Sequence, residues 1–149
     1  MNNILGTNVV TQIGILVEDI DKTAQAYADF FNIEKPEIFK TDPLEKSEAK
    51  YQGQPTEAIA KQAFFDLGSL QLELIEPDEK PSAWREYLDT NGEGPHHIAF
   101  NIEGMEEKIS LMEGKGMKLQ QKGEYTGGRY AYLDSFDQLK IIVELLEND

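Results

Sequence analysis

Cysteine is missing from this sequence of 149 residues, and histidine occurs only twice. Without cysteine the chain can form no disulfide bond, no catalytic thiolate and no zinc finger. The sequence also lacks an apolar run long enough to cross a membrane, and its first residues show no basic-then-apolar signal pattern. We therefore expect a cytoplasmic protein.

Basic residues are few as well: 14 lysines and arginines stand against 28 aspartates and glutamates, which gives a net charge of −14. This charge disfavours nucleic acid and anionic membranes as partners, because their phosphates would be repelled. The hydrophobic share of 40% is typical of a soluble globular protein, and the length suits one domain or two small fused modules. We expect a small molecule as the partner.

Both histidines lie in one segment, Gly94 to Asn101, at the start of an apolar run. From His97 onward, apolar side chains at every second position predict a strand. Adjacent residues of a regular strand point to opposite faces, so His96 and His97 are predicted to serve different faces. We expect His97 to be a metal ligand and His96 to be structural or solvent-facing.

The remaining elements are predicted from alternating apolar residues, which indicate strands, and from apolar stripes at helical spacing. Residues 34–58 are polar and contain three prolines, so we interpret them as a long loop, a kind of segment that often serves a site. The predicted strands cover 9–17, 60–67, 70–75, 96–102, 117–121, 129–133 and 139–146, and the predicted helices cover about 20–31, 81–91 and 105–115.

An internal repeat organises these elements, because a strand, a helix and further strands occur twice in the same order. The first copy is 14 residues longer than the second, and the excess falls in the polar region before Ala60. We predict one domain made of module one (about 8–78), a connecting helix (about 81–91) and module two (about 94–147).

The repeat aligns Gln12 with His97 and Glu73 with Glu144. Each of these residues lies on a strand that is otherwise apolar, where an unpaired charge would cost several kcal/mol. Two modules that face each other would bring all four into one cleft. One imidazole, one amide and two carboxylates form a nitrogen and oxygen donor set that suits Zn, Ni, Co, Mn or Fe.

Five segments of the repeat follow one another in a characteristic order. They are Gln12-Ile-Gly-Ile-Leu-Val-Glu-Asp-Ile, Leu70-Gln-Leu-Glu-Leu-Ile-Glu-Pro, Gly94-Pro-His-His-Ile-Ala-Phe, Gly127-Gly-Arg-Tyr-Ala-Tyr and Ile142-Val-Glu-Leu-Leu. This ordered set resembles the vicinal oxygen chelate superfamily, which includes glyoxalase I, methylmalonyl-CoA epimerase and bleomycin resistance proteins, and the resemblance covers about residues 9–147. It implies an α+β fold in which two βαβββ modules form a cupped mixed sheet around a divalent metal ion, and it implies a homodimer.

In this family the metal ligands occupy one position on the opening strand and one on the closing strand of each module. The matching residues here are Gln12, Glu73, His97 and Glu144. Glutamine at the first position looks like zinc-type glyoxalase I. Ring-cleaving dioxygenases of the family use two histidines and one carboxylate, so Gln12 disfavours that reaction. The resemblance thus implies a divalent cofactor such as Zn, Ni, Co or Mn.

The resemblance also implies a chemistry: the metal ion binds a carbonyl or thioester oxygen of the substrate and stabilises the enolate formed when the α-proton leaves. Glu144 is then the first candidate for the catalytic base and Glu73 the second. The residue nearest to the base of the epimerases is Gln62, which cannot accept a proton. This departure disfavours epimerisation.

The substrate itself is predicted to contact Arg129, which follows two glycines and whose planar guanidinium suits a carboxylate or a phosphate. Tyr132, Phe65, Gln62 and Trp84 are predicted to line the pocket. Two functions stay open: a metal-dependent lyase or isomerase of the glyoxalase/epimerase type, or a metal-free small-molecule binding or resistance protein of the same fold. The four ligand-capable residues favour the enzyme.

Overall fold

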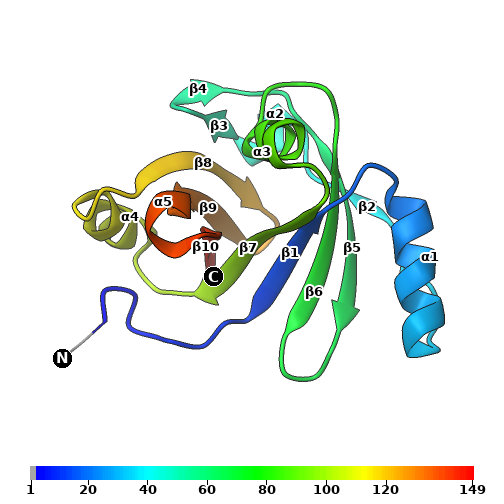
Figure 1. The fold of residues 1–149 in the computed structure, drawn as a ribbon. Coiled ribbons are helices and arrows are strands. Elements are labelled where there is room, and N and C mark those ends of the chain that lie inside the picture. The colour runs from blue at the N-terminus through cyan, green and yellow to red at the C-terminus, as the bar shows by residue number, and fades with distance from the viewer. Residues whose placement is uncertain (1–2) are drawn as a thin grey trace.

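The structure is a computed structural model that describes residues 3–149. Within this range ten strands form one curved sheet, in the order β2-β5-β6-β1-β7-β10-β9-β8-β3-β4 (Figure 1). The strands are β1 Gln12–Leu16, β2 Phe39–Lys40, β3 Lys50–Tyr51, β4 Gln54–Pro55, β5 Ala60–Asp66, β6 Gln71–Pro77, β7 Gly94–Asn101, β8 Lys118–Tyr125, β9 Gly128–Asp134 and β10 Ile142–Asn148. The helices are α1 Ile20–Phe31, α2 Leu44–Ser47, α3 Ala83–Asn91, α4 Met105–Glu113 and α5 Phe136–Leu139.

Two modules of the same topology make up the sheet. The first contains β1, α1, β2, β5 and β6, and the second contains β7, α4, β8, β9 and β10. In each module the opening strand runs parallel to the closing strand, as β1 does with β6 and β7 with β10. The predicted α+β fold with two βαβββ modules in a cupped mixed sheet is confirmed.

The modules join through β1 and β7, which pair antiparallel within one chain. Ile13 lies opposite Ile98, Gln12 opposite Ala99, and Gly14 opposite His97. This register is symmetric about the Ile13–Ile98 pair, so equivalent residues of the two modules approach each other across the joint.

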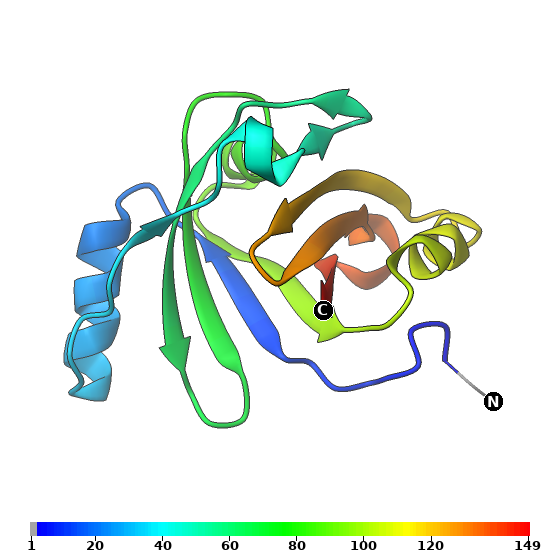
Figure 2. The same ribbon diagram turned by 180° about the vertical axis from the view of Figure 1, so that it is seen from behind.

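Helices α1 and α4 cover the convex outer side of the two modules (Figures 1 and 2). Ile20 and Ala24 of α1 pack against Leu74, while Ile109 and Met112 of α4 belong to a second apolar cluster beneath module two. Both helices begin at a carboxylate from the closing strand of their own module. Among residues 3–149, no helix combines the length and the hydropathy that a membrane span requires.

These helix-capping carboxylates are a repeated feature of the fold. Glu76 accepts a hydrogen bond from the Ile20 amide at 3.0 Å, and Glu147 accepts from the amides of Gly104 at 2.7 Å and Met105 at 3.2 Å. A helix N-terminus favours a negative charge because its first amide groups have no partner in the helix. The two glutamates align in the repeat for this structural reason.

Residues 39–55, predicted as part of a loop, form a strap that joins the two edges of the sheet. The strap begins with β2, which pairs with β5 at the edge of module one, and ends with the β3–β4 hairpin. Strand β3 pairs with β8 at the edge of module two. Figure 2 shows this segment crossing from one module to the other. The extra length of the first copy therefore closes the cup.

Candidate metal centre

Four adjacent strands in the middle of the sheet, β6, β1, β7 and β10, each direct one polar side chain to the same point. They are Glu73, Gln12, His97 and Glu144, all buried. His97 Nε2 lies 2.8 Å from Gln12 Oε1, 3.4 Å from Glu73 Oε1 and 3.1 Å from Glu144 Oε1. The structure thus brings together the four residues that the sequence repeat pairs.

The orientation of the Gln12 side-chain amide bears on whether these four residues suit a metal ion. Its oxygen lies 3.2 Å from a carboxylate oxygen of Glu73 and 3.0 Å from one of Glu144, and its NH₂ group donates to Gln71 Oε1 at 2.6 Å. Three oxygens with no proton between them repel one another unless a cation lies among them. In this orientation the donor set fits a divalent ion.

A second orientation of the same amide needs no ion. If Gln12 were turned, its NH₂ group would donate to both carboxylates and to His97. Its oxygen would then lie 2.6 Å from Gln71 Oε1, which is favourable only if Gln71 turns as well. Gln71 therefore helps to decide which atom of Gln12 faces the centre, a role that sequence analysis missed.

The charges at the centre are strongly coupled. Burial alone would lower the pKa of His97, but the neighbouring Glu144 and Glu73 outweigh burial and raise this pKa to about 9. Burial also raises the pKa of Glu73, although its contacts with His97 oppose this change. Without a metal ion, a proton on His97 therefore supplies the positive charge that the carboxylates require.

Gly14 provides the space in which the His97 ring lies. A Cβ atom added at Gly14 would lie 2.0 Å from His97 Cε1 and 2.5 Å from His97 Nε2, far inside van der Waals contact. Only glycine fits at this position of β1, since the ring of the opposite residue covers it. A glycine inside a predicted strand often marks such a close approach, so a signal for this role was present in the sequence.

His96 does not lie where the alternation of β7 predicts. The pairing of β1 with β7 steps from Gly14–His97 to Ile15–Pro95, so His96 is an extra residue in a β-bulge. The bulge brings the two imidazoles together, with 3.0 Å between His96 Nδ1 and His97 Nδ1. The prediction that the two histidines serve unrelated faces is wrong, because it assumed a regular strand.

A cavity of about 570 Å³ opens over the centre. Its wall includes three of the four converging residues, parts of the strap, and aromatic residues of module two. Lys40 is the only lysine or arginine among its lining residues. The lining residues are Thr11, Gln12, Lys40, Thr41, Asp42, Ser47, Ala49, Ala58, Gln62, Phe64, Gln71, Glu73, Trp84, Asn101, Glu124, Tyr125, Tyr130, Tyr132, Glu144, Leu146 and Asn148.

Three of the residues predicted to line the pocket lie on this wall. Gln62 donates a hydrogen bond to Glu73 Oε2 at 2.7 Å, and so holds one of the converging carboxylates. Tyr132 accepts a hydrogen bond from Trp84 Nε1 at 3.0 Å, which links β9 to α3. Burial raises the pKa of Tyr132 well above its ordinary value, and the nearby carboxylates add to the effect, so its hydroxyl keeps its proton.

Phe65 and Arg129 lie elsewhere. The Phe65 ring belongs to the apolar cluster under α1, 5.6 Å from the ring of Tyr27, and its strand neighbour Phe64 lines the cavity instead. Arg129 is not among the lining residues, and it forms ion pairs with three carboxylates, those of Glu124, Glu147 and Asp149. The structure therefore gives no support to their predicted contacts with substrate.

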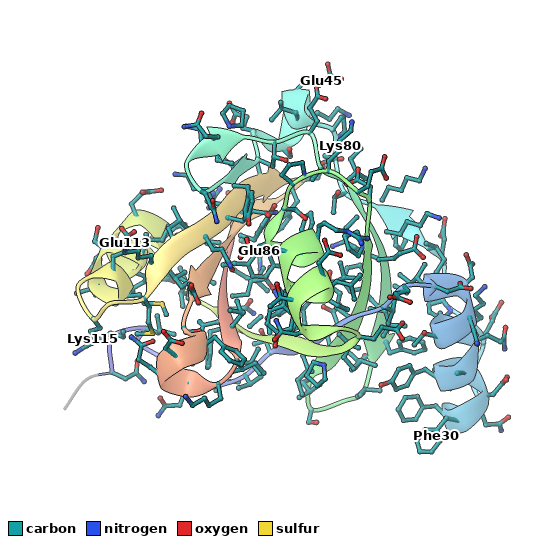
Figure 3. The ribbon with its side chains drawn as sticks, turned by 45° about the horizontal axis from the view of Figure 1, so that its top comes forward. Phe30, Glu45, Lys80, Glu86, Glu113 and Lys115 are labelled. Atoms are coloured by element: carbon teal, nitrogen blue, oxygen red, sulfur yellow. The ribbon has the colours of Figure 1, made fainter. Side chains whose placement is uncertain are left out.

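Many charged residues outside the centre lie at the surface. Figure 3 labels Glu45 on α2, Glu86 on α3 and Glu113 on α4, all of them exposed. The acidic surface and the acidic centre are thus separate features, because Glu73 and Glu144 are the only buried aspartates or glutamates among residues 3–149.

Comparison with known proteins agrees with this architecture. A family model described as Glyoxalase/Bleomycin resistance protein/Dioxygenase superfamily matches residues 11–132. This range includes Gln12, Glu73 and His97, while Glu144 lies beyond it. Over 88 residues the chain is 32% identical to the uncharacterized protein YqjC of Bacillus subtilis (strain 168). That alignment covers 57% of this chain and 63% of the relative's length.

Solved structures share the fold at lower identity. A methylmalonyl-CoA epimerase from Mycobacterium tuberculosis has a TM-score of 0.65 and 17% identity, with 100% of this chain and 92% of that chain covered. A methylmalonyl-CoA epimerase in complex with methylmalonyl-CoA and NH4+ has a TM-score of 0.61 and 24% identity, with 93% of each chain covered. A hypothetical protein from Bacillus halodurans C-125 has a TM-score of 0.63 and 21% identity, with 94% of each chain covered.

Proposed function

Because the chain belongs to the glyoxalase/bleomycin resistance protein/dioxygenase superfamily, we propose that it is a metal-dependent enzyme that moves a proton at the carbon next to a carbonyl or thioester group. Such an enzyme is a lyase of the glyoxalase type or an isomerase of the epimerase type. The observation that carries the proposal is the meeting of an imidazole, an amide oxygen and two carboxylates at the wall of one cavity.

Gln12, Glu73, His97 and Glu144 would hold the ion, and their nitrogen and oxygen atoms suit Zn, Ni, Co or Mn. When bound, the ion would supply the positive charge that stabilises the enolate left after the α-proton has gone. The donor set of the chain itself carries two negative charges, so a divalent ion would leave the centre neutral. A neutral centre in a buried place avoids the cost of an unpaired charge.

Glu144 is the better candidate for the catalytic base. One oxygen of Glu73 is held by the Gln62 amide at 2.7 Å, whereas no amide holds Glu144 among the described residues. A base has to reach the substrate proton and to carry it, which a fixed carboxylate does less well. Gln62, which cannot accept a proton, holds Glu73 in place.

The geometry favours transfer of the proton to a neighbouring carbon over inversion of one carbon. Inversion needs an acid or base on each side of the carbon, and transfer along the chain needs one group that takes the proton and returns it. With Glu73 held by Gln62, Glu144 is one such group. The epimerase neighbours support a substrate of the acyl-CoA class, and the glyoxalase part of the family supports a hemithioacetal.

A metal-free binding protein of the same fold is the second candidate. The turned amide of Gln12 would satisfy both carboxylates, and a protonated His97 would balance part of their charge. The cavity would then bind a small molecule without any reaction.

Metal analysis and an exchange assay separate the two candidates. The protein would be purified without added metal and titrated with Zn or Ni by calorimetry, and α-proton exchange would be followed by NMR in D₂O on a hemithioacetal and an acyl-CoA. We expect one ion per chain, and exchange that stops on adding a chelator. If fewer than about one chain in ten held a metal and none was taken up on titration, the enzyme proposal would be overturned.

A further inference from the structure

We propose that His96 is a positioning residue: it accepts the ring proton of His97 and so leaves His97 Nε2 free to bind the metal ion. The inference rests on the proposed function, since it concerns how the same centre is prepared for its ion. It assigns a role to His96, which was predicted from the sequence to be structural or solvent-facing.

The contact between the two rings carries the inference. His96 Nδ1 and His97 Nδ1 lie 3.0 Å apart, both rings are fully buried, and the ring centroids are 5.1 Å apart. The bulge in β7 creates this contact, because a regular strand would send the two side chains to opposite faces. Two Nδ1 atoms at this distance form a hydrogen bond only if one of them carries a proton and the other does not.

The two ways to place this proton have opposite effects on the centre. If His97 donates through Nδ1, its Nε2 has a free lone pair directed at Gln12, Glu73 and Glu144, as a metal ligand requires. If His96 donates, a neutral His97 carries its proton on Nε2, and that proton occupies the place of the ion. When His96 accepts the proton of His97 Nδ1, His97 Nε2 can bind a metal ion. When His96 donates instead, the proton on His97 Nε2 prevents metal binding.

Packing alone does not explain an imidazole at this position. The ring of His96 lies among aromatic rings, 4.8 Å from Tyr87 and 5.2 Å from Tyr132. Its Nε2 atom is buried with no hydrogen-bond partner among the described residues. A buried polar atom without a partner is costly, and phenylalanine would fill similar space without that cost. Within residues 3–149, the contact of Nδ1 with His97 is the only hydrogen bond that this ring makes.

Two variants separate positioning from packing. His96→Gln keeps an oxygen that can accept from His97 Nδ1–H, and His96→Phe keeps an aromatic ring without an acceptor. Zinc affinity would be measured by calorimetry and folding by thermal denaturation. We expect His96→Phe to weaken zinc binding by about 10- to 100-fold, as loss of a ligand's supporting hydrogen bond does, and His96→Gln to stay within about threefold of the wild type.

A spectroscopic measurement on the wild type needs neither variant to fold. In protein labelled with ¹⁵N at histidine and saturated with zinc, long-range ¹H–¹⁵N spectra should show His97 protonated at Nδ1 and His96 protonated at Nε2. A proton on His96 Nδ1 in the zinc-bound protein would overturn the inference, and so would equal zinc affinity of folded His96→Phe and wild type. If the wild type bound no zinc, the proposed function would fail together with this inference.

Discussion

The closing strands β6 and β10 each bring a glutamate to the candidate metal centre, yet the two carboxylates have different surroundings. On β6, Glu73 is held by Gln62 of the neighbouring strand. In the register of module two the position of Gln62 corresponds to Tyr130, whose hydroxyl accepts a hydrogen bond from Gln121 instead. The carboxylate of the first module therefore has a side-chain amide donor on the neighbouring strand, and the carboxylate of the second module has none at the equivalent position. A repeated fold can in this way give equivalent residues different surroundings, which under the proposed function would divide metal binding and proton transfer between the two copies.

Substituting each glutamate with glutamine should give the largest effects and should test whether the two carboxylates have different roles. Glu144→Gln keeps an oxygen for the metal but loses the base, so we expect α-proton exchange to fall by about 10²- to 10⁴-fold at saturating zinc. Glu73→Gln, the matched variant, should weaken zinc binding but lose less than about tenfold in exchange once zinc is saturating. Equal losses of exchange at saturating zinc would show that the two carboxylates share one role.

The joint between the modules offers the next test, because Gly14 and Ala99 are equivalent in the repeat. Gly14→Ala would push the His97 ring from its place, so we expect a loss of about 1–3 kcal/mol in the free energy of unfolding and zinc binding at least tenfold weaker. Ala99→Gly, the control, creates no clash and should cost about 1 kcal/mol with little change in zinc affinity. Calorimetry and thermal denaturation measure both. Unchanged zinc affinity in Gly14→Ala would mean that His97 does not bind the ion.

Metal binding should also release a proton from His97, an effect that is smaller than those of the substitutions above but can be measured on the wild type. The pKa of His97 rises from 6.5 to about 9 in the metal-free protein, since Glu144 and Glu73 outweigh burial. A raised pKa stabilises the fold fully below about pH 6.5, and this stabilisation is lost as the pH rises through about 9. Zinc requires the unprotonated nitrogen, so binding at pH 7 should release about one proton per chain.

Calorimetry in buffers of different ionisation enthalpy would count that proton, and the melting temperature of the metal-free protein should fall between pH 7 and 9. His97→Gln, the control, should abolish both effects. A wild type that releases no proton at pH 7 would show that the carboxylates do not hold His97 in its charged form.

The smallest effects are expected from substituting one basic side chain in each module, and they concern KM. Arg129 of module two is engaged by three carboxylates, so Arg129→Ala should change KM by less than about twofold. Lys40 of the strap lies on the cavity wall, and Lys40→Ala should raise KM for an anionic substrate by about three- to tenfold. Steady-state kinetics would decide, and a larger effect at Arg129 would restore it as the substrate anchor.

The internal repeat in the sequence predicts the two-module fold and the four candidate ligands, because two modules of the same fold place similar residues at equivalent positions. Aligning Gln12 with His97 and Glu73 with Glu144 identifies four residues that the structure brings within hydrogen-bonding distance of one another or close to it. The regular period of each strand sufficed for this, since the side chains on one face follow from counting alone.

Departures from regular geometry account for what the sequence analysis missed. The bulge at His96 depends on how β1 and β7 pair, which the local pattern of β7 does not contain. Phe64 and Phe65 could each face the cavity until the register with β6 is known. The strap has strands of only two residues, too short for an alternation to be seen, and its partner β8 lies in the other module.

Strand β3 of the strap pairs with β8 of module two over two residues. Lys50 lies opposite Lys122 and Tyr51 opposite Gln121, and the backbone N–H of Gln52 donates to the backbone carbonyl of Gln120 at 2.8 Å. Like charges directly opposite each other weaken a strand pair, so this edge has little to resist local unfolding. We expect its amides to exchange with solvent sooner than those of β1 and β7. Ser47 and Ala49 of the strap line the cavity, so a brief separation there would widen access to it while the four central strands stay paired. A substrate could then enter without displacing the four candidate metal ligands.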